Sequence, residues 1–159
     1  MNITTTTTTT TIRAASPADI PAVAELFDLY RQFYEQEPDG QLALEFITER
    51  LCRRESVILV AENPQVGLIG FCQLYPTFCS VEARPIYCLY DLFVIPAARR
   101  SGAGSLLLQA ANAEAASSGK VRMDLTTART NAAAQSLYKS LGWVRDDVFF
   151  AYSKNVVLS

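Results

Sequence analysis

The stretch Arg99-Arg100-Ser101-Gly102-Ala103-Gly104 decides how this 159-residue sequence is interpreted. An apolar run ends before it at Pro96, and a run rich in leucine and alanine follows it. This pattern predicts a strand, a tight loop and a helix, in that order. Helix N-termini present unpaired N–H groups and the positive end of the macrodipole, and glycine lets an anion approach the backbone. The stretch is therefore typical of a phosphate-binding loop. A simple tight turn is the alternative that the Gly-x-Gly pair alone leaves open.

Two common nucleotide-binding motifs are absent from the sequence. No Gly-x-x-x-x-Gly-Lys-Ser/Thr string occurs, which excludes a P-loop. The Rossmann fingerprint needs a third glycine where Leu107 stands. That fingerprint also belongs near a first strand, whereas this loop lies in the second half of the chain.

Charge and composition narrow the class of protein further. The net charge is −2, half of the residues are hydrophobic and 19% are charged, so a folded domain is expected. The longest arginine clusters are the pairs Arg53-Arg54 and Arg99-Arg100, which disfavours nucleic-acid binding. The chain has no histidine, which excludes Ser-His-Asp and Cys-His catalysis and the common histidine-based metal sites. We expect no metal.

The four cysteines and the N-terminus indicate a cytoplasmic protein. Neither a C-x-x-C motif nor a zinc spacing occurs among Cys52, Cys72, Cys79 and Cys88, so reduced thiols are expected. A nucleophilic cysteine is the alternative, although no histidine could activate it. The threonine-rich residues 1–8 are not typical of a signal peptide and are predicted to be a disordered tail. No apolar run approaches the ~18 residues of a membrane span.

Hydrophobic periodicity and turn residues predict an α/β (α+β) fold. The expected helices cover residues 16–34, 42–53, 102–116 and 131–141. The expected strands cover residues 9–14, 57–61, 66–75, 86–95, 121–126, 144–152 and 156–158, with the segment 76–85 as a loop.

Three motifs in this order resemble the GCN5-related N-acetyltransferases (GNAT). Arg99, Gly102 and Gly104 match the family's Gln/Arg-x-x-Gly-x-Gly/Ala signature for acetyl-CoA. The preceding Asp91-Leu92-Phe93-Val94 is similar to the family's Asp-Leu-Phe/Tyr-Val strand before a proline. Downstream, the family's Asn-x-x-Ala-x-x-x-Tyr is matched by Asn131, Ala134 and Tyr138. The resemblance covers about residues 10–153 and looks closest to the histone/polyamine-type, small-amine branch.

The resemblance implies a fold, a cosubstrate and its binding residues. The expected fold is a single GNAT domain over residues 9–159, with a mixed, mostly antiparallel sheet of six to seven strands flanked by about four helices. The cosubstrate is acetyl-CoA. Its implied contacts are Leu92, Phe93, Val94, Arg99, Arg100, Ser101, Gly102, Ala103, Gly104, Ser105, Asn131, Ala134 and Tyr138.

The resemblance also implies roles in acetyl transfer to an amine. Tyr138 is expected to protonate the departing thiolate, since a phenol with a pKa of ~10 is protonated at neutral pH. Asp91, or a water chain to another acid, is expected to accept the proton of the amine; the other candidates are Glu35, Glu37, Asp39 and Glu82. Tyr90 stands where several polyamine acetyltransferases have a glutamate, and Arg100 where the family often has glycine.

The expected substrate is a primary amine of a small molecule or a peptide. The resemblance also allows a homodimer, which no motif in the sequence specifies. A different class of function stays open as the alternative, namely a catalytically silent GNAT-like module that binds CoA as a sensor or interaction domain. Tyr138 favours the enzyme, because a binding module needs no proton donor.

Overall fold

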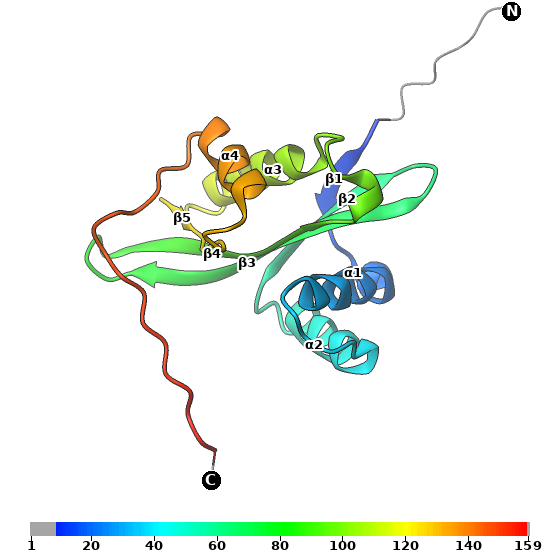
Figure 1. Ribbon diagram of the computed structural model, residues 1–159, viewed down its shortest axis with the longest axis horizontal. Coiled ribbons are helices and arrows are strands. Elements are labelled where there is room, and N and C mark those ends of the chain that lie inside the picture. The colour runs from blue at the N-terminus through cyan, green and yellow to red at the C-terminus, as the bar shows by residue number, and fades with distance from the viewer. Residues whose placement is uncertain (1–8, 159) are drawn as a thin grey trace, which may run out of the picture. The chain divides into compact units, whose positions relative to one another are not determined.

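The computed structural model describes residues 9–158, and the tail predicted over residues 1–8 lies outside them. The chain divides into two compact units, Met1–Thr126 and Thr127–Ser159. Among the described residues, the first unit contains the β-sheet and three α-helices, and the second contains one α-helix followed by irregular chain (Figure 1). No helix between residues 9 and 158 has the length and apolar character that crossing a membrane requires.

The sheet of the first unit is mixed and mostly antiparallel, as predicted. Its order is β1-β2-β3-β4-β5, in which neighbours are antiparallel except for the parallel pair β4 and β5. The strands are β1 (Thr11–Ala14), β2 (Val57–Asn63), β3 (Gly67–Cys79), β4 (Arg84–Val94) and β5 (Met123–Asp124). β2 and β3 form the predicted hairpin.

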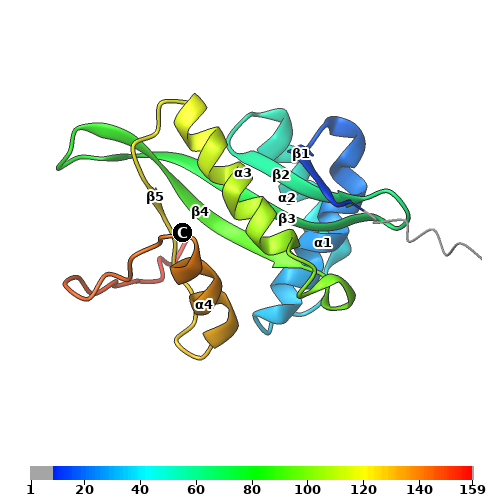
Figure 2. The same cartoon turned by 90° about the horizontal axis from the view of Figure 1, so that it is seen from above.

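Helices cover both faces of this sheet. α1 (Ile20–Phe33) and α2 (Gly40–Cys52) lie on one face, and α3 (Ala103–Ser117) crosses β2, β3 and β4 on the other (Figures 1 and 2). The predicted helix start is confirmed: Ser16 and Asp19 form a capping box around a short 3-10 turn, Pro17–Asp19, which leads into α1.

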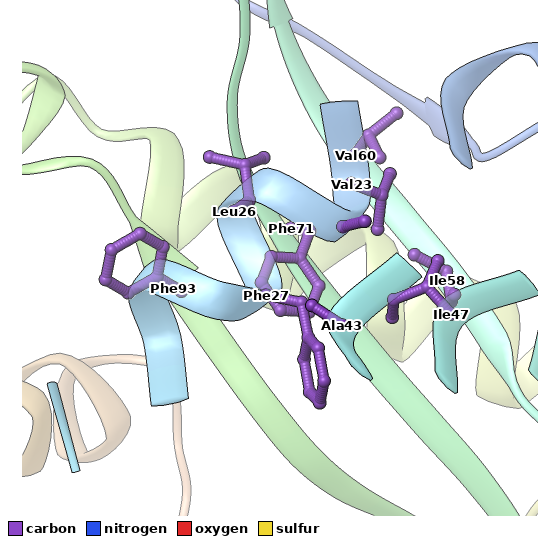
Figure 3. Close-up of a cluster of buried hydrophobic side chains, with 10 residues drawn as sticks. Val23, Leu26, Phe27, Ala43, Ile47, Ile58, Val60, Phe71 and Phe93 are labelled. Atoms are coloured by element: carbon purple, nitrogen blue, oxygen red, sulfur yellow. The ribbon is translucent and has the colours of Figure 1, made fainter. Parts of the chain in front are cut away.

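The core between the sheet and the α1/α2 layer is largely aromatic and aliphatic. Phe71 of β3 lies beside Phe27 of α1, Phe93 of β4 belongs to the same cluster, and Ile47 of α2 lies near Ile58 of β2 (Figure 3). The rings of Phe27 and Phe71 meet edge to face, with centroids 6.4 Å apart. Burial of these side chains fixes α1 against the first half of β3 and the end of β4.

Gly70 allows β3 to approach β4 closely. A Cβ at this position would lie 2.7 Å from the carbonyl oxygen of Phe93, a contact that requires the backbone to move. We expect Gly70→Ala to lower the free energy of unfolding by about 1–3 kcal/mol. At this chain length that corresponds to a melting temperature lower by about 2–4 °C per kcal/mol.

Gly40→Ala is the matched control for Gly70→Ala in thermal unfolding. A Cβ at Gly40 would meet no heavy atom within 4 Å, so its melting temperature should not fall. Equal melting temperatures for the two variants would show that the backbone of β4 moves to accommodate the added methyl group without a loss of stability.

The predicted count of six to seven strands is wrong for the described residues, which form five. No strand occurs over residues 144–152 or 156–158. Within the first of these segments, the Asp146 carboxylate accepts hydrogen bonds from the N–H groups of Val148 and Phe149, 2.8 and 3.2 Å away. This turn takes up donors that a sheet ladder would use, and aspartate disfavours strands.

Two other boundaries also differ from the prediction. The segment 76–85, predicted as a loop, continues β3 to Cys79 and starts β4 at Arg84, because Pro76–Cys79 pair with Arg84–Tyr87. The strand predicted over residues 121–126 shrinks to two residues. β5 therefore pairs with β4 only at Tyr87 and Cys88.

The second unit contains α4 (Ala132–Ser140), which is closed at both ends by local hydrogen bonds. The Asn131 side chain caps the N-terminus by accepting from the Ala134 N–H at 3.2 Å. At the C-terminus, Gly142 has a φ of 84°, and the N–H of Trp143 donates to the Tyr138 carbonyl at 3.0 Å. The N–H of Gly142 also donates to the Lys139 carbonyl at 3.1 Å, and these two C-terminal bonds form a Schellman motif, so the predicted end of the helix at Gly142 is confirmed.

Candidate active site

A β-bulge in β4 places two candidate side chains on one face of the sheet. Gln73 lies opposite Asp91 and Leu74 opposite Leu89, so Tyr90 is the extra residue. The Tyr90 ring meets the ring of Tyr75 edge to face, with centroids 5.9 Å apart. Since Gln73 and Tyr75 share one face of β3, both Tyr90 and Asp91 lie on that face, which is covered by α1.

Asp91 ends a chain of buried polar side chains. Ser56 donates to the side-chain oxygen Oε1 of Gln73 at 2.7 Å, and the side-chain NH₂ group of Gln73 donates to the Asp91 carboxylate. Ser56, Gln73 and Asp91 are 8%, 0% and 3% exposed. The Tyr30 hydroxyl is also within reach of the Asp91 carboxylate, although its proton is donated to the Tyr90 carbonyl oxygen at 3.1 Å.

Burial raises the pKa of Asp91 above that of an ordinary aspartate. The hydrogen bond from Gln73, and the nearby Tyr30 hydroxyl, favour the carboxylate and oppose this shift, but burial is the larger effect. A carboxylate with a raised pKa accepts a proton more readily than a surface aspartate, so Asp91 is suited to act as a base.

The loop after β4 is anchored to the end of that strand by Arg99. Its Nε donates to the Val94 carbonyl at 3.1 Å, and its guanidinium carbon lies 5.7 and 5.8 Å from the ring centroids of Phe33 and Phe93. These contacts hold the loop where the strand ends. Arg100 has a φ of 63°, in the left-handed region that favours glycine, which is the physical reason for the glycine usual at this position.

The N-terminus of α3 fits the predicted anion site in its backbone geometry. Gly102 is the N-cap with a φ of 88°, and no side chain within the described part of the chain caps the helix there. Ala103, the first residue of α3, is buried. Ser101 donates to the Ala98 carbonyl at 2.6 Å, which shapes the loop, and the Ser105 hydroxyl accepts from Gln109.

A pair of matched variants tests the anion site. Gly102 precedes α3 and Gly119 follows it; both have positive φ, and a Cβ at either would meet no heavy atom within 4 Å. Each change to alanine should cost about 1–2 kcal/mol through backbone strain. If the loop binds phosphate, only Gly102→Ala should also raise the KM for acetyl-CoA, by roughly tenfold. Equal KM values for the two variants, measured by thiol release, would argue against binding at this loop.

The predicted contacts Leu92, Phe93 and Val94 are the last three residues of β4. Phe93 is buried toward α1, whereas Leu92 and Val94 are half-buried. Because β5 ends its pairing at Cys88, this part of β4 has no strand partner on that edge among the described strands. Backbone groups at this edge can pair with an amide-bearing ligand, since an edge presents unpaired N–H and C=O groups.

The remaining candidates belong to the second unit. Asn131, Ala134 and Tyr138 are half-buried, and Asn131 serves as the N-cap of α4. The Tyr138 ring lies beside Trp143, with centroids 5.9 Å apart. Asn131 therefore has a structural role that explains its presence at the start of α4.

The other acids considered as bases occupy different environments. The Asp39 carboxylate caps α2 by accepting from the Leu42 N–H at 2.9 Å. Glu82 forms an ion pair with Arg122 at 2.9 Å, near the tip of the β3–β4 hairpin. Glu35 and Glu37 lie in the exposed turn between α1 and α2. None of these four is buried beside the bulge, which sets Asp91 apart.

Burial disfavours the reactive thiolate at two of the four cysteines. All four are unpaired in the described chain. Burial raises the pKa of Cys72 to about 12 and also raises that of Cys88. Since the thiolate is the nucleophile, these shifts disfavour a catalytic cysteine at either position.

Sequence reasoning missed Tyr30, Gln73 and Ser56. Tyr30 has helical spacing with the core residues of α1, so its hydroxyl was not singled out. Gln73 did carry a signal: it is an amide inside the apolar run 67–75, and a buried amide requires a hydrogen-bonding partner.

Comparison with known proteins agrees with this geometry. Residues 22–143 match the model of the acetyltransferase (GNAT) family. The chain is 48% identical over 145 residues to the uncharacterized N-acetyltransferase YhfO of Bacillus subtilis (strain 168), covering 91% of this chain and 97% of YhfO. Among solved structures, a probable acetyltransferase has a TM-score of 0.86 at 35% identity, covering 94% of this chain and 99% of the other. Aminoglycoside N-acetyltransferase AAC(6')-Iy, solved in complex with CoA, shares the fold with a TM-score of 0.79 at 19% identity, over 94% of this chain and 97% of the other.

Proposed function

Because the chain belongs to the acetyltransferase (GNAT) family, we propose that it transfers the acetyl group of acetyl-CoA to a primary amine of a small molecule or peptide by direct attack in a ternary complex. The observation that carries this proposal is the continuity of β4 and the loop after it. One strand presents a buried carboxylate at its bulge and then leads, through Arg99, into the uncapped N-terminus of α3.

The loop and the end of β4 would hold acetyl-CoA. Its pyrophosphate would accept hydrogen bonds from the N–H groups of Gly102 to Ser105, with charge from Arg99 and Arg100. The pantetheine arm would pair with the edge of β4 along Leu92, Phe93 and Val94. By the family resemblance, we propose Asn131 and Ala134 as further contacts of the cosubstrate. A backbone N–H of β4 would polarise the thioester carbonyl.

The reaction needs two proton movements around the attack. The substrate enters as an ammonium ion, since a lysine-like amine has a pKa of ~10.4, and it must lose a proton before its nitrogen can attack. Asp91 would accept that proton. After the C–N bond forms, the C–S bond breaks and Tyr138 protonates the thiolate. The second proton of the nitrogen then restores the Tyr138 hydroxyl, and the first proton leaves Asp91 to solvent. The sum is one acetamide, one CoA thiol and one proton released.

A thiol-release assay tests the function directly. The protein is mixed with acetyl-CoA and a panel of polyamines, amino acids, aminoglycosides and lysine peptides, and free CoA thiol is measured. We expect turnover that depends on one class of amine. Binding of CoA without turnover on any amine would favour the silent sensor module instead. A cytoplasmic location and a homodimer remain predictions, the second of which gel filtration with light scattering checks.

A further inference from the structure

The base assigned above is out of reach of a substrate. The Asp91 side chain is 3% exposed, so an amine at the surface cannot contact its oxygens directly. A proton acceptor must lie within hydrogen-bond distance of the proton it takes, or be connected to it through an intermediate group. Some group must therefore carry the proton inward.

The hydrogen-bond partners of Asp91 differ in how they connect to the surface. Gln73 is fully buried and leads only to Ser56, which is also buried. The remaining partner, Tyr30, is half-buried at the end of α1, and its hydroxyl lies at the bulge, donating to the Tyr90 carbonyl. Tyr90 is 67% exposed, so this hydroxyl belongs to the part of the network nearest the surface.

We propose that the Tyr30 hydroxyl is a catalytic relay, which takes the proton of the acceptor ammonium while its own proton passes to Asp91. The N–H bond of the ammonium breaks as an O–H bond forms on Tyr30. The Tyr30 O–H turns from the Tyr90 carbonyl to the Asp91 carboxylate, and this O–H bond breaks as one forms on the carboxylate. No charge remains on the tyrosine. The proposal deepens the function proposed above and rests on it.

The surroundings of Tyr30 require the two transfers to occur together. Burial, with Asp91 as the next contribution, raises the pKa of Tyr30 well above that of a free phenol, so a tyrosinate would not accumulate. A hydroxyl that donates and accepts at the same time can pass a proton without ionising. The Tyr30 ring is held in place by Phe71 and Phe93, with centroids 6.1 and 6.5 Å away, and this fixes the hydroxyl.

Tyr30→Phe tests the relay, and Tyr34→Phe is its matched control. Phenylalanine keeps the ring in the aromatic core. Tyr34 lies on the same side of the helix end, its ring 5.1 Å from Tyr30, but it is exposed. With the best amine of the panel, we expect Tyr30→Phe to lower kcat/KM for the amine on the order of 100-fold, with the KM for acetyl-CoA unchanged. Tyr34→Phe should stay within about twofold of wild type.

The pH profile separates a relay from a purely structural role. The ionisable or charged groups around Asp91 and its partners are Tyr30 and Tyr34 of α1, Arg50 of α2, Cys72 and Tyr75 of β3, and Cys88 and Tyr90 of β4. Removing the Tyr30 hydrogen bond raises the pKa of Asp91. If Tyr30 only tuned Asp91, the variant's profile would move to higher pH and reach the wild-type plateau. A relay predicts a lower plateau at every pH.

A neutral amine gives a second readout. Trifluoroethylamine is largely neutral at pH 7 and needs no proton removed before attack, so the Tyr30→Phe deficit should shrink with it. A wild-type plateau for Tyr30→Phe, or an equal deficit with both amines, would overturn the relay while leaving the acetyltransferase proposal intact. Absence of wild-type turnover with every amine would overturn both.

Discussion

Replacing Asp91 by asparagine should lower kcat/KM for the amine by roughly 100- to 10,000-fold while the protein stays folded. Asparagine keeps the shape of the side chain but accepts no proton at neutral pH. Its amide oxygen can accept from Gln73, and its NH₂ group can donate to the Tyr30 hydroxyl, which still donates to the Tyr90 carbonyl. The loss of activity would therefore report the missing base.

The same variant should be as stable as wild type or more stable at pH 7. Folding raises the pKa of Asp91 above its unfolded value of ~3.9, so the folded state holds this proton more tightly. As pH rises from about 4 through the folded pKa, the wild type loses stability because it must bury a charge. Asp91→Asn has no such loss. Its melting temperature relative to wild type should rise over this interval and be independent of pH above it.

Glu82→Gln is the control for Asp91→Asn. It removes another of the acids considered as bases, at a distant exposed ion pair with Arg122. We expect near-wild-type kinetics for it. A large loss for Glu82→Gln together with normal activity of Asp91→Asn would transfer the role of base away from the bulge.

Tyr138→Phe should lower kcat on the order of 100-fold and leave the KM for acetyl-CoA nearly unchanged. The ring and its contact with Trp143 are kept, so α4 should remain folded. Only the protonation of the departing thiolate is removed. Tyr152→Phe is the matched control, because Tyr152 is an exposed tyrosine of the same unit. An unchanged kcat in Tyr138→Phe would remove this residue from the mechanism.

Local patterns in the sequence predicted most of the first unit correctly. The capping box at Ser16, the β2–β3 hairpin and the glycine-ended helices depend on residues close together in the chain. These are features that periodicity and capping rules describe. The family and its acetyltransferase class were also predicted, since three short motifs in the right order are specific.

The errors arose where distant pairing or a local turn decides the structure. The segment 144–152 is rich in β-branched and aromatic residues, but a strand exists only where a neighbour pairs with it, and the Asp146 turn interrupts the run. The Tyr30–Asp91–Gln73 network could not be predicted from the sequence, because it also depends on pairing between distant residues. Gln73 and Asp91 are 18 residues apart, and only the register of β3 against β4 brings them together.

If Asp91 is the base, the buried carboxylate beside the bulge offers a way to distinguish relatives that catalyse the transfer from relatives that only bind CoA. A chain that only binds CoA gains nothing from a charge sealed inside its sheet, and mutation would be free to remove it. Relatives that retain the glycine loop but carry an amide or an apolar residue at the position of Asp91 are then expected to be binding proteins. On this proposal, the residue at the position of Asp91 separates enzymes from CoA-binding sensors that share the fold.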